Sequence, residues 1–167
     1  MPYRNKTYVA FDGDKDIHYY RLMTAWTQSD RTSFNFYDAH VSKQSRDTSS
    51  EETIKASLRA RLNESKMFVL LVGESTKYLH KFVSWEIEQA IKMDLPIIVV
   101  NLNGKRSMDE TRCPTLLRTH LALHISFNTK ILQKSLEEWS SDYFRLKREG
   151  KSGPFYYNDS SYSALGL

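Results

Sequence analysis

The chain has 167 residues, of which 40% are hydrophobic and 13% aromatic, and its formal net charge is +4 at pH 7. This length and composition fit one folded domain and exclude an intrinsically disordered chain. No stretch approaches the roughly 20 apolar residues of a membrane-spanning helix, and the first residues lack a signal-peptide run, so we expect a cytoplasmic protein with no membrane partner.

In the first part of the chain, predicted strands and helices alternate. Residues 6–12, KTYVAFD, predict a buried strand that ends in acidic residues before a loop. Apolar residues then recur at helical spacing over 16–28. Residues 34–40, FNFYDAH, alternate like an edge strand, and the polar run up to Ser50 predicts a loop.

The alternation continues through the second part. Ser49 or Ser50 is suited to cap a helix over 51–63, where Ile54, Leu58 and Leu62 share one face. The later predicted elements are strands at 67–73, 96–102 and 121–127 and helices at 80–94, 115–118 and 129–147. The tail from Gly150 is rich in Gly, Ser, Tyr and Asn, and we expect it to be loosely packed.

This order predicts an α/β fold, a doubly wound parallel five-stranded sheet with helices on both faces. We expect one domain at 1–149 and a C-terminal tail at 150–167. In such sheets ligands bind beyond the carboxyl ends of the strands, where the strand order reverses. That rule selects residues 11–16, 38–42 and 73–84 as the candidate site.

Several kinds of chemistry lack their motif. Neither glycine-rich phosphate loop occurs, no nucleophile elbow surrounds Ser75 or Ser84, and Cys and His do not cluster as metal ligands, so we expect no metal. Lys and Arg are scattered without a nucleic-acid motif, so we expect no nucleic-acid partner. Asp12, Asp14 and Lys130 resemble a phospho-receiver, but the third strand ends in VGES without the acceptor aspartate.

Glu86 is the best candidate for a catalytic residue. On a helical wheel Val83, Ile87 and Ala90 form the apolar side, Glu86 lies on its shoulder, and Glu88 lies further toward solvent. A shoulder position near a helix start can point into the cleft, partly desolvated. Periodicity alone nevertheless favours the simpler interpretation that both glutamates are surface charges.

Three segments together resemble the TIR-like domains of the Thoeris ThsB type. They are VAFDGD after the first strand, FYDAH, and the long run LLVGESTKYLHKFVSWEIEQAIKMDLPIIVV. The resemblance covers roughly the first 125 residues. In this family a glutamate four residues after an aromatic, usually tryptophan, is catalytic. Glu86 matches it with Phe82 in the aromatic place, while Trp85 stands next to the glutamate.

The resemblance implies an enzyme that consumes NAD as its substrate and needs no cofactor. It cleaves the nicotinamide–ribose bond and makes a cyclic or modified ADP-ribose that activates an effector protein. Self-association or a phage protein as the trigger remains open. The implied substrate-binding residues are Phe11, Asp12, Asp38, His40, Ser75 and Phe82.

Other interpretations of these residues remain open. Phe11 suits the core, Asp12 suits a turn cap, Asp38 and His40 suit an ordinary loop, and His124 suits a hydrogen-bonded structural role in a strand. The main rival function is a non-catalytic TIR-like module that binds nucleotide or protein. A flavodoxin-type binder would need phosphate-binding residues after the first strand, where FDGDKD offers acid instead.

Overall fold

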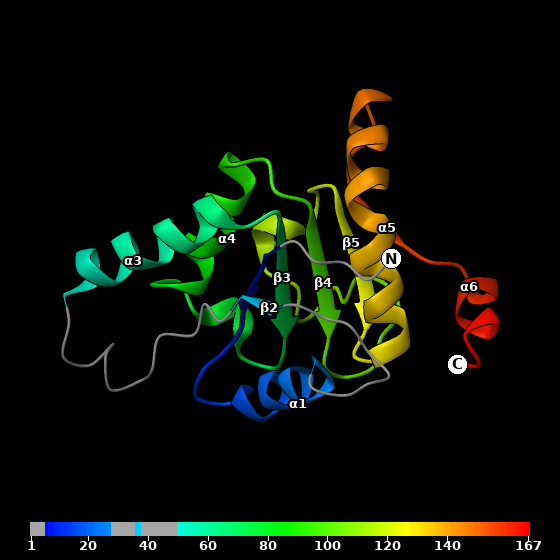
Figure 1. The fold of residues 1–167 in the computed structure, drawn as a ribbon, viewed down its shortest axis with the longest axis horizontal. Coiled ribbons are helices and arrows are strands. Elements are labelled where there is room, and N and C mark those ends of the chain that lie inside the picture. The colour runs from blue at the N-terminus through cyan, green and yellow to red at the C-terminus, as the bar shows by residue number, and fades with distance from the viewer. Residues whose placement is uncertain (1–5, 28–35, 38–49) are drawn as a thin grey trace.

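The computed structural model describes residues 6–27, 36–37 and 50–167. Within these residues six parallel strands form one sheet in the order β2-β1-β3-β4-β5-β6 (Figure 1). The strands are β1 (Thr7–Ala10), β2 (Phe36–Tyr37), β3 (Met67–Val72), β4 (Ile97–Asn101), β5 (Ala122–Ser126) and β6 (Pro154–Tyr156). The helices are α1 (Ile17–Thr27), α3 (Glu51–Glu64), α4 (Val83–Lys92), α5 (Thr129–Arg148) and α6 (Asp159–Ala164), with short 3-10 turns at Thr76–Tyr78 and Thr115–Leu117.

The strand order reverses at β1. The chain runs from β1 outward to the edge strand β2 and then returns to β3 on the other side of β1. The loops that follow β1 and β3 therefore lead to helices on opposite faces of the sheet, the arrangement beside which parallel sheets of this kind bind ligands. This arrangement confirms the predicted parallel α/β fold and places the residues after β1 and β3 at its switch point.

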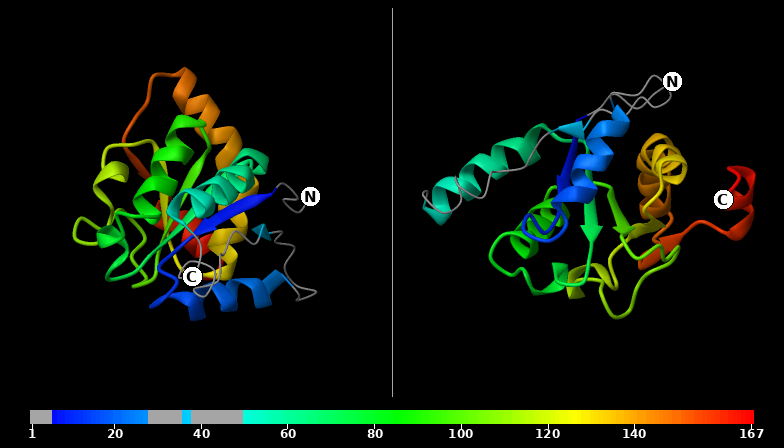
Figure 2. Two further views of the ribbon diagram at one scale, coloured as in Figure 1. Left: turned by 90° about the vertical axis from the view of Figure 1, so that its left-hand side faces the viewer. Right: turned by 90° about the horizontal axis from the view of Figure 1, so that it is seen from below.

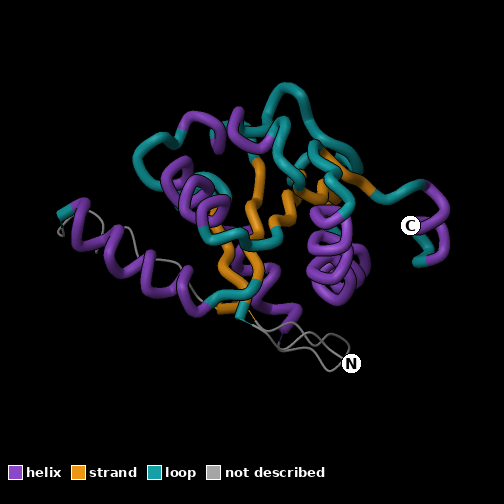
Figure 3. The backbone as a smooth tube through the Cα atoms, turned by 90° about the horizontal axis from the view of Figure 1, so that it is seen from above, coloured by secondary structure: helices purple, strands orange, loops and turns teal. Residues whose placement is uncertain are grey.

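Two apolar layers lie on opposite faces of the sheet. One contains the buried side chains of α1 and α5, including Met23 and Leu136, and the other contains those of α3 and α4, including Leu58 and Ile87. Figures 2 and 3 show these helices on the two sides of the strands. Since β3 and β4 are covered on both faces, all their residues are buried, as their apolar sequences predict.

Helix α3 begins where the sequence predicts. The Ser50 side chain accepts a hydrogen bond from the backbone N–H of Thr53 at 3.2 Å, and Ile54, Leu58 and Leu62 are buried. Among the described helices, none combines the length and apolar character needed to cross a bilayer.

The expectation of a loosely packed tail is wrong. Strand β6 pairs with β5, so the sheet has one strand more than the five expected. Tyr162 of α6 is fully buried, and its hydroxyl accepts a hydrogen bond from the Ser126 backbone N–H at 3.3 Å. The tail packs against the core because its aromatic residues supply apolar surface. The prediction took account of its Gly and Ser content and not of these aromatic residues.

Replacement of Tyr162 by Ala tests this packing. Removal of a fully buried aromatic ring should lower the free energy of unfolding by roughly 3–5 kcal/mol. Urea denaturation measures the change, with Tyr156→Ala, at a residue 61% exposed, as the matched control. Equal midpoints for the two variants would show that the tail adds little to the core.

His124 on β5 is buried, but its role differs from the one expected. The side chain is 0% exposed, and neither ring nitrogen has a hydrogen-bond partner among the described residues. Burial in this apolar layer lowers the pKa of His124 to about 4. The histidine is therefore held neutral by packing and not by a hydrogen bond.

The depressed pKa of His124 predicts acid sensitivity. The imidazole takes up a proton more readily in the unfolded chain than in the folded protein. The contribution of the neutral side chain to the free energy of unfolding is therefore complete above pH 6.5 and is lost as the pH falls toward 4, a change of about 3 kcal/mol. Burial also lowers the pKa of His120, so a variant is needed to separate the effect of His124 on the pH dependence from that of His120. Urea denaturation from pH 7 to 4 should show a flatter pH dependence for His124→Leu than for the wild type. Equal slopes would contradict the assignment.

Candidate functional site

Glu86 lies in the first turn of α4, inside the layer between that helix and the sheet. Its side chain is only 3% exposed, among the buried residues Val83, Ile87 and Ala90 of the same helix. The surface-charge interpretation is therefore wrong for Glu86, although Glu88 is exposed as predicted. The shoulder position on the wheel becomes a buried one because α3 and β1 close over that side of α4.

Tyr8 of β1 holds the Glu86 carboxyl group. Its hydroxyl donates a hydrogen bond of 2.7 Å to Oε2 of Glu86, and both groups are buried. The Tyr8 ring is 0% exposed and stacks on Phe68 of β3, with ring centroids 5.5 Å apart and planes 12° apart. The carboxyl group is thus fixed from strand β1, 78 residues away along the chain.

A buried carboxyl group at this point is a cost to folding. Its desolvation opposes burial, and an apolar residue would pack equally well among Val83, Ile87 and Ala90. Two features offset the cost in part: the Tyr8 hydroxyl, and the N-terminal end of α4, whose partial positive charge favours an acid in its first turn. Such departures from the best packing are typical of functional sites.

Asp12 closes the turn that follows β1. Its Oδ1 accepts hydrogen bonds from the backbone N–H groups of Asp14 at 3.0 Å and Lys15 at 3.2 Å, and it is 4% exposed. The Asp12 carbonyl also accepts the N–H of Asp16 at 2.8 Å. The structure therefore gives Asp12 the turn-capping role that was its simpler interpretation.

Asp16 is a buried acid that the sequence analysis did not single out. It precedes α1, is 8% exposed, and its Oδ2 has no hydrogen-bond partner among the described residues. Burial, and then the Asp12 carboxylate, raise the pKa of Asp16 above its ordinary value. The carboxyl group lies against the Cα of Gly73, directly after β3. A glycine at the end of an apolar strand was the available signal for such a close contact.

Ser75 and Lys15 link the two loops of the switch point. The Lys15 ammonium group donates to the Ser75 hydroxyl at 2.7 Å, which joins the loop after β1 to the loop after β3. Phe82 is half-buried at the start of α4, where its carbonyl accepts the N–H of Glu86 at 2.8 Å. Ser75 and Phe82 therefore lie on the segment that leads from β3 into Glu86.

One expected site residue, Phe11, is not brought to Glu86. Phe11 lies on the opposite face of the sheet, where it stacks on Tyr20 of α1 at a centroid distance of 4.7 Å. Its side chain thus belongs to the packing of α1, as its alternative interpretation proposed. Asp38 and His40 lie outside the described residues.

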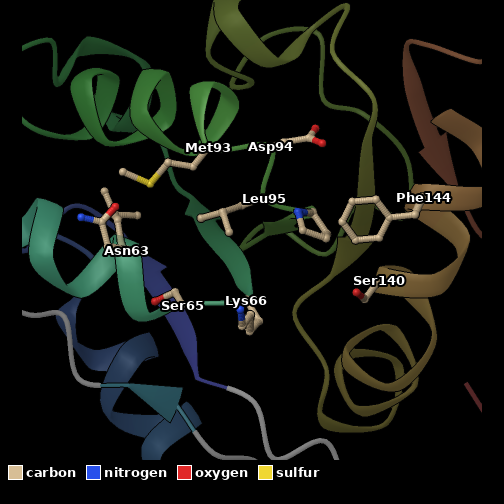
Figure 4. Close-up of a pocket in the computed structure, with 10 residues that line it drawn as sticks. Asn63, Ser65, Lys66, Met93, Asp94, Leu95, Ser140 and Phe144 are labelled. Atoms are coloured by element: carbon tan, nitrogen blue, oxygen red, sulfur yellow. The ribbon is translucent and has the colours of Figure 1, made fainter. Parts of the chain in front are cut away.

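A pocket of about 460 Å³ opens at the other edge of the sheet, by the amino ends of β3 and β4 (Figure 4). Leu95 and Phe144 point into it, with Lys66 at one side. Its one acidic group, Asp94, already accepts a hydrogen bond from Tyr143 at 2.6 Å and pairs with Lys147. This pocket holds no buried acid comparable to Glu86.

Metal chemistry has no support in the described part of the chain. No group of three or more His, Cys, Asp or Glu side chains there is arranged to hold a metal ion. The described residues offer the buried carboxyl group of Glu86, held by the Tyr8 phenol, and the buried acids Asp12 and Asp16 in the loop after β1. Such an arrangement can stabilise positive charge that develops on a bound substrate.

A parallel α/β domain with its strand reversal at β1 and a buried glutamate at the start of α4 is of the TIR-like class. The family model of the Thoeris protein ThsB, TIR-like domain, matches residues 8–107, more than half of the chain. The chain therefore belongs to this family and is a TIR-like protein related to Thoeris defence. The matched segment begins at Tyr8 and includes Ser75, Phe82 and Glu86.

The contact between Gly73 and Asp16 makes a prediction about stability. A Cβ at residue 73 would overlap the Asp16 carboxyl group, so Gly73→Ala should cost roughly 1–3 kcal/mol of unfolding free energy. Asp16→Ala removes the obstacle, so the double variant should be nearly as stable as Asp16→Ala alone. Urea denaturation of the four proteins measures the coupling, and additive losses would argue against the contact.

Proposed function

We propose that this protein cleaves NAD at the nicotinamide–ribose bond, with Glu86 as the catalytic residue. The observation that carries the proposal is the buried carboxyl group of Glu86, held at 2.7 Å by Tyr8 at the start of α4. Membership of the ThsB TIR-like family supports the same residue, because the family match covers Glu86 and the sequence around it resembles the segment that carries that family's catalytic glutamate. The product would be a cyclic or otherwise modified ADP-ribose that activates an effector protein.

The leaving group explains how one carboxyl group is enough. The ring nitrogen of nicotinamide carries a positive charge in NAD, and nicotinamide leaves as a neutral molecule when its bond to the ribose breaks. It therefore needs no proton from a second acid, unlike the alcohol released by a glycosidase. As the bond breaks, positive charge develops at the ribose carbon. A fixed carboxylate in an apolar layer stabilises that charge, and its oxygens also suit the ribose hydroxyls.

The loops of the switch point suit the rest of the dinucleotide. NAD carries negative charge on its two phosphate groups. The positive charges of Lys15 and Arg112 lie near Asp16, where they act to lower its pKa, and are available to oppose that negative charge. Lys15 is joined to Ser75, and Arg112 is paired with the exposed Glu74 at 3.5 Å. Formation of a cyclic product further requires that water be excluded, so that a group of the substrate itself attacks the ribose.

The test is NAD consumption with mass analysis of the products. Wild type, Glu86→Gln and Glu88→Gln are compared as purified proteins and in cells exposed to phage. Glu86→Gln keeps an oxygen for the Tyr8 hydroxyl but loses the charge, so activity should fall about 10²–10³-fold. Glu88 is exposed on the same helix, and its replacement should leave activity unchanged.

Two results decide between the rival functions. An ADP-ribose-derived product from wild type and Glu88→Gln, but not from Glu86→Gln, supports the enzyme, and its mass separates cyclisation from hydrolysis. Equal NAD levels with all three proteins under triggering conditions would contradict catalysis and favour a binding module. Thermal unfolding of each protein shows whether a loss of activity is a loss of fold.

A further inference from the structure

We infer that Tyr8 is a positioning residue that fixes the orientation of the Glu86 carboxyl group for the reaction. The inference rests on the proposed function and adds to it a residue on a different element. Tyr8 lies on β1, which is paired with β2 on one side and β3 on the other, and Glu86 lies on α4, so the hydrogen bond between them sets the position of the acid relative to the sheet.

The Tyr8 ring is held more firmly than the glutamate. It is 0% exposed, stacks on Phe68, and rises from a strand that pairs with neighbours on both sides. A tyrosine has two side-chain torsions, and here both are fixed by packing, whereas a glutamate has three. A hydrogen bond from a fixed phenol therefore removes more freedom from Glu86 than Glu86 removes from Tyr8.

The hydroxyl group is not explained by packing. Phenylalanine would stack on Phe68 and fill the same space, because the two side chains differ only in the hydroxyl. In this apolar layer an unpaired hydroxyl would cost stability, and the structure pairs it with Glu86 at 2.7 Å. The pairing thus places a hydrogen-bond donor on the acid, beside the apolar side chains of this layer.

Reaction rate depends strongly on such placement. A carboxyl group displaced by about 1 Å from the reacting carbon can lose up to 10²-fold in rate. Binding of NAD draws on contacts with the whole dinucleotide and depends less on one side-chain torsion. If Tyr8 positions Glu86, its replacement should therefore lower kcat and leave KM nearly unchanged.

Tyr8→Phe is the direct test, and Tyr143→Phe is its matched control. Tyr143 is also a buried tyrosine that donates to a carboxyl group, Asp94, at 2.6 Å, but at the opposite edge of the sheet. Both variants remove one phenol–carboxylate bond and should lower the Tm. Only Tyr8→Phe should lower kcat for NAD, by about 10- to 100-fold, with KM within about twofold of wild type.

The double variant Tyr8→Phe/Glu86→Gln shows whether Tyr8 acts through Glu86. The residual kcat of Glu86→Gln should not fall further when Tyr8 is also changed, because the charge that Tyr8 positions is already gone. A further tenfold fall would overturn the inference, since Tyr8 would then act on the substrate independently.

Other outcomes separate the inference from the proposed function. If Glu86→Gln retains full activity, the proposed function itself fails. If Glu86→Gln is inactive and Tyr8→Phe matches wild type, only the positioning role is overturned. Higher activity of Tyr8→Phe would also overturn it, because the bond would then restrain Glu86 in a resting arrangement.

A second substitution keeps the test decisive if Tyr8→Phe does not fold. 3-Fluorotyrosine at position 8 preserves the ring and the hydroxyl but makes the hydroxyl a stronger donor. A changed kcat with an unchanged KM and Tm supports the positioning role. An unchanged kcat in the folded protein would contradict it.

Discussion

The hydrogen bond between the Tyr8 phenol and the Glu86 carboxyl group joins strand β1 to helix α4 beside the apolar side chains of that layer. The position of the site depends on it, because β1 is the strand at which the sheet order reverses and α4 follows directly from its neighbour β3. The packing of Val83, Ile87 and Ala90 holds the helix against the sheet, and the hydrogen bond holds the acid within that packing. Sheet topology and acid placement are therefore parts of one arrangement.

Two buried acids carry a desolvation cost. Glu86 and Asp16 are both buried acids, and Oδ2 of Asp16 has no hydrogen-bond partner among the described residues. An apolar residue at either position would avoid a desolvation penalty. By the amino ends of β3 and β4, Asp94 is satisfied by Tyr143 and Lys147 beside the pocket lined by Leu95 and Phe144. Polar groups buried at a cost to folding are typical of functional sites.

Much of the fold follows from the sequence, because periodicity and strand composition are local signals. The apolar run 67–73 predicts a strand buried on both faces, and Ser50 with the Ile54, Leu58 and Leu62 spacing predicts α3. The tail does not follow from its sequence, because Tyr162 is buried only through contacts with β5 and the helices over that face. The amino-acid composition of a segment shows which of its residues are flexible. It does not show which surface of the folded domain that segment packs against.

The site is predictable only in part. Position on a helical wheel places Glu86 near the apolar side of α4, and resemblance to the ThsB type selects it over Glu88. Its partner Tyr8 is 78 residues distant and reads in the sequence as one more β-former, so the pairing appears only when the sheet is assembled. Phe11 shows the converse, since its place after Tyr8 in the same motif suggests a shared site, yet strand alternation puts it on the other face.

A structure of the protein with a carbocyclic NAD analogue, whose nicotinamide–ribose bond cannot be cleaved, tests the central claim most directly. The account predicts that the analogue lies across the carboxyl ends of β1 and β3, with a Glu86 oxygen within hydrogen-bonding distance of the nicotinamide-side ribose ring. It also predicts that the Tyr8 hydroxyl remains bound to that carboxyl group. An analogue bound elsewhere, for example in the pocket lined by Leu95 and Phe144, with Glu86 still enclosed and out of its reach, would contradict the account.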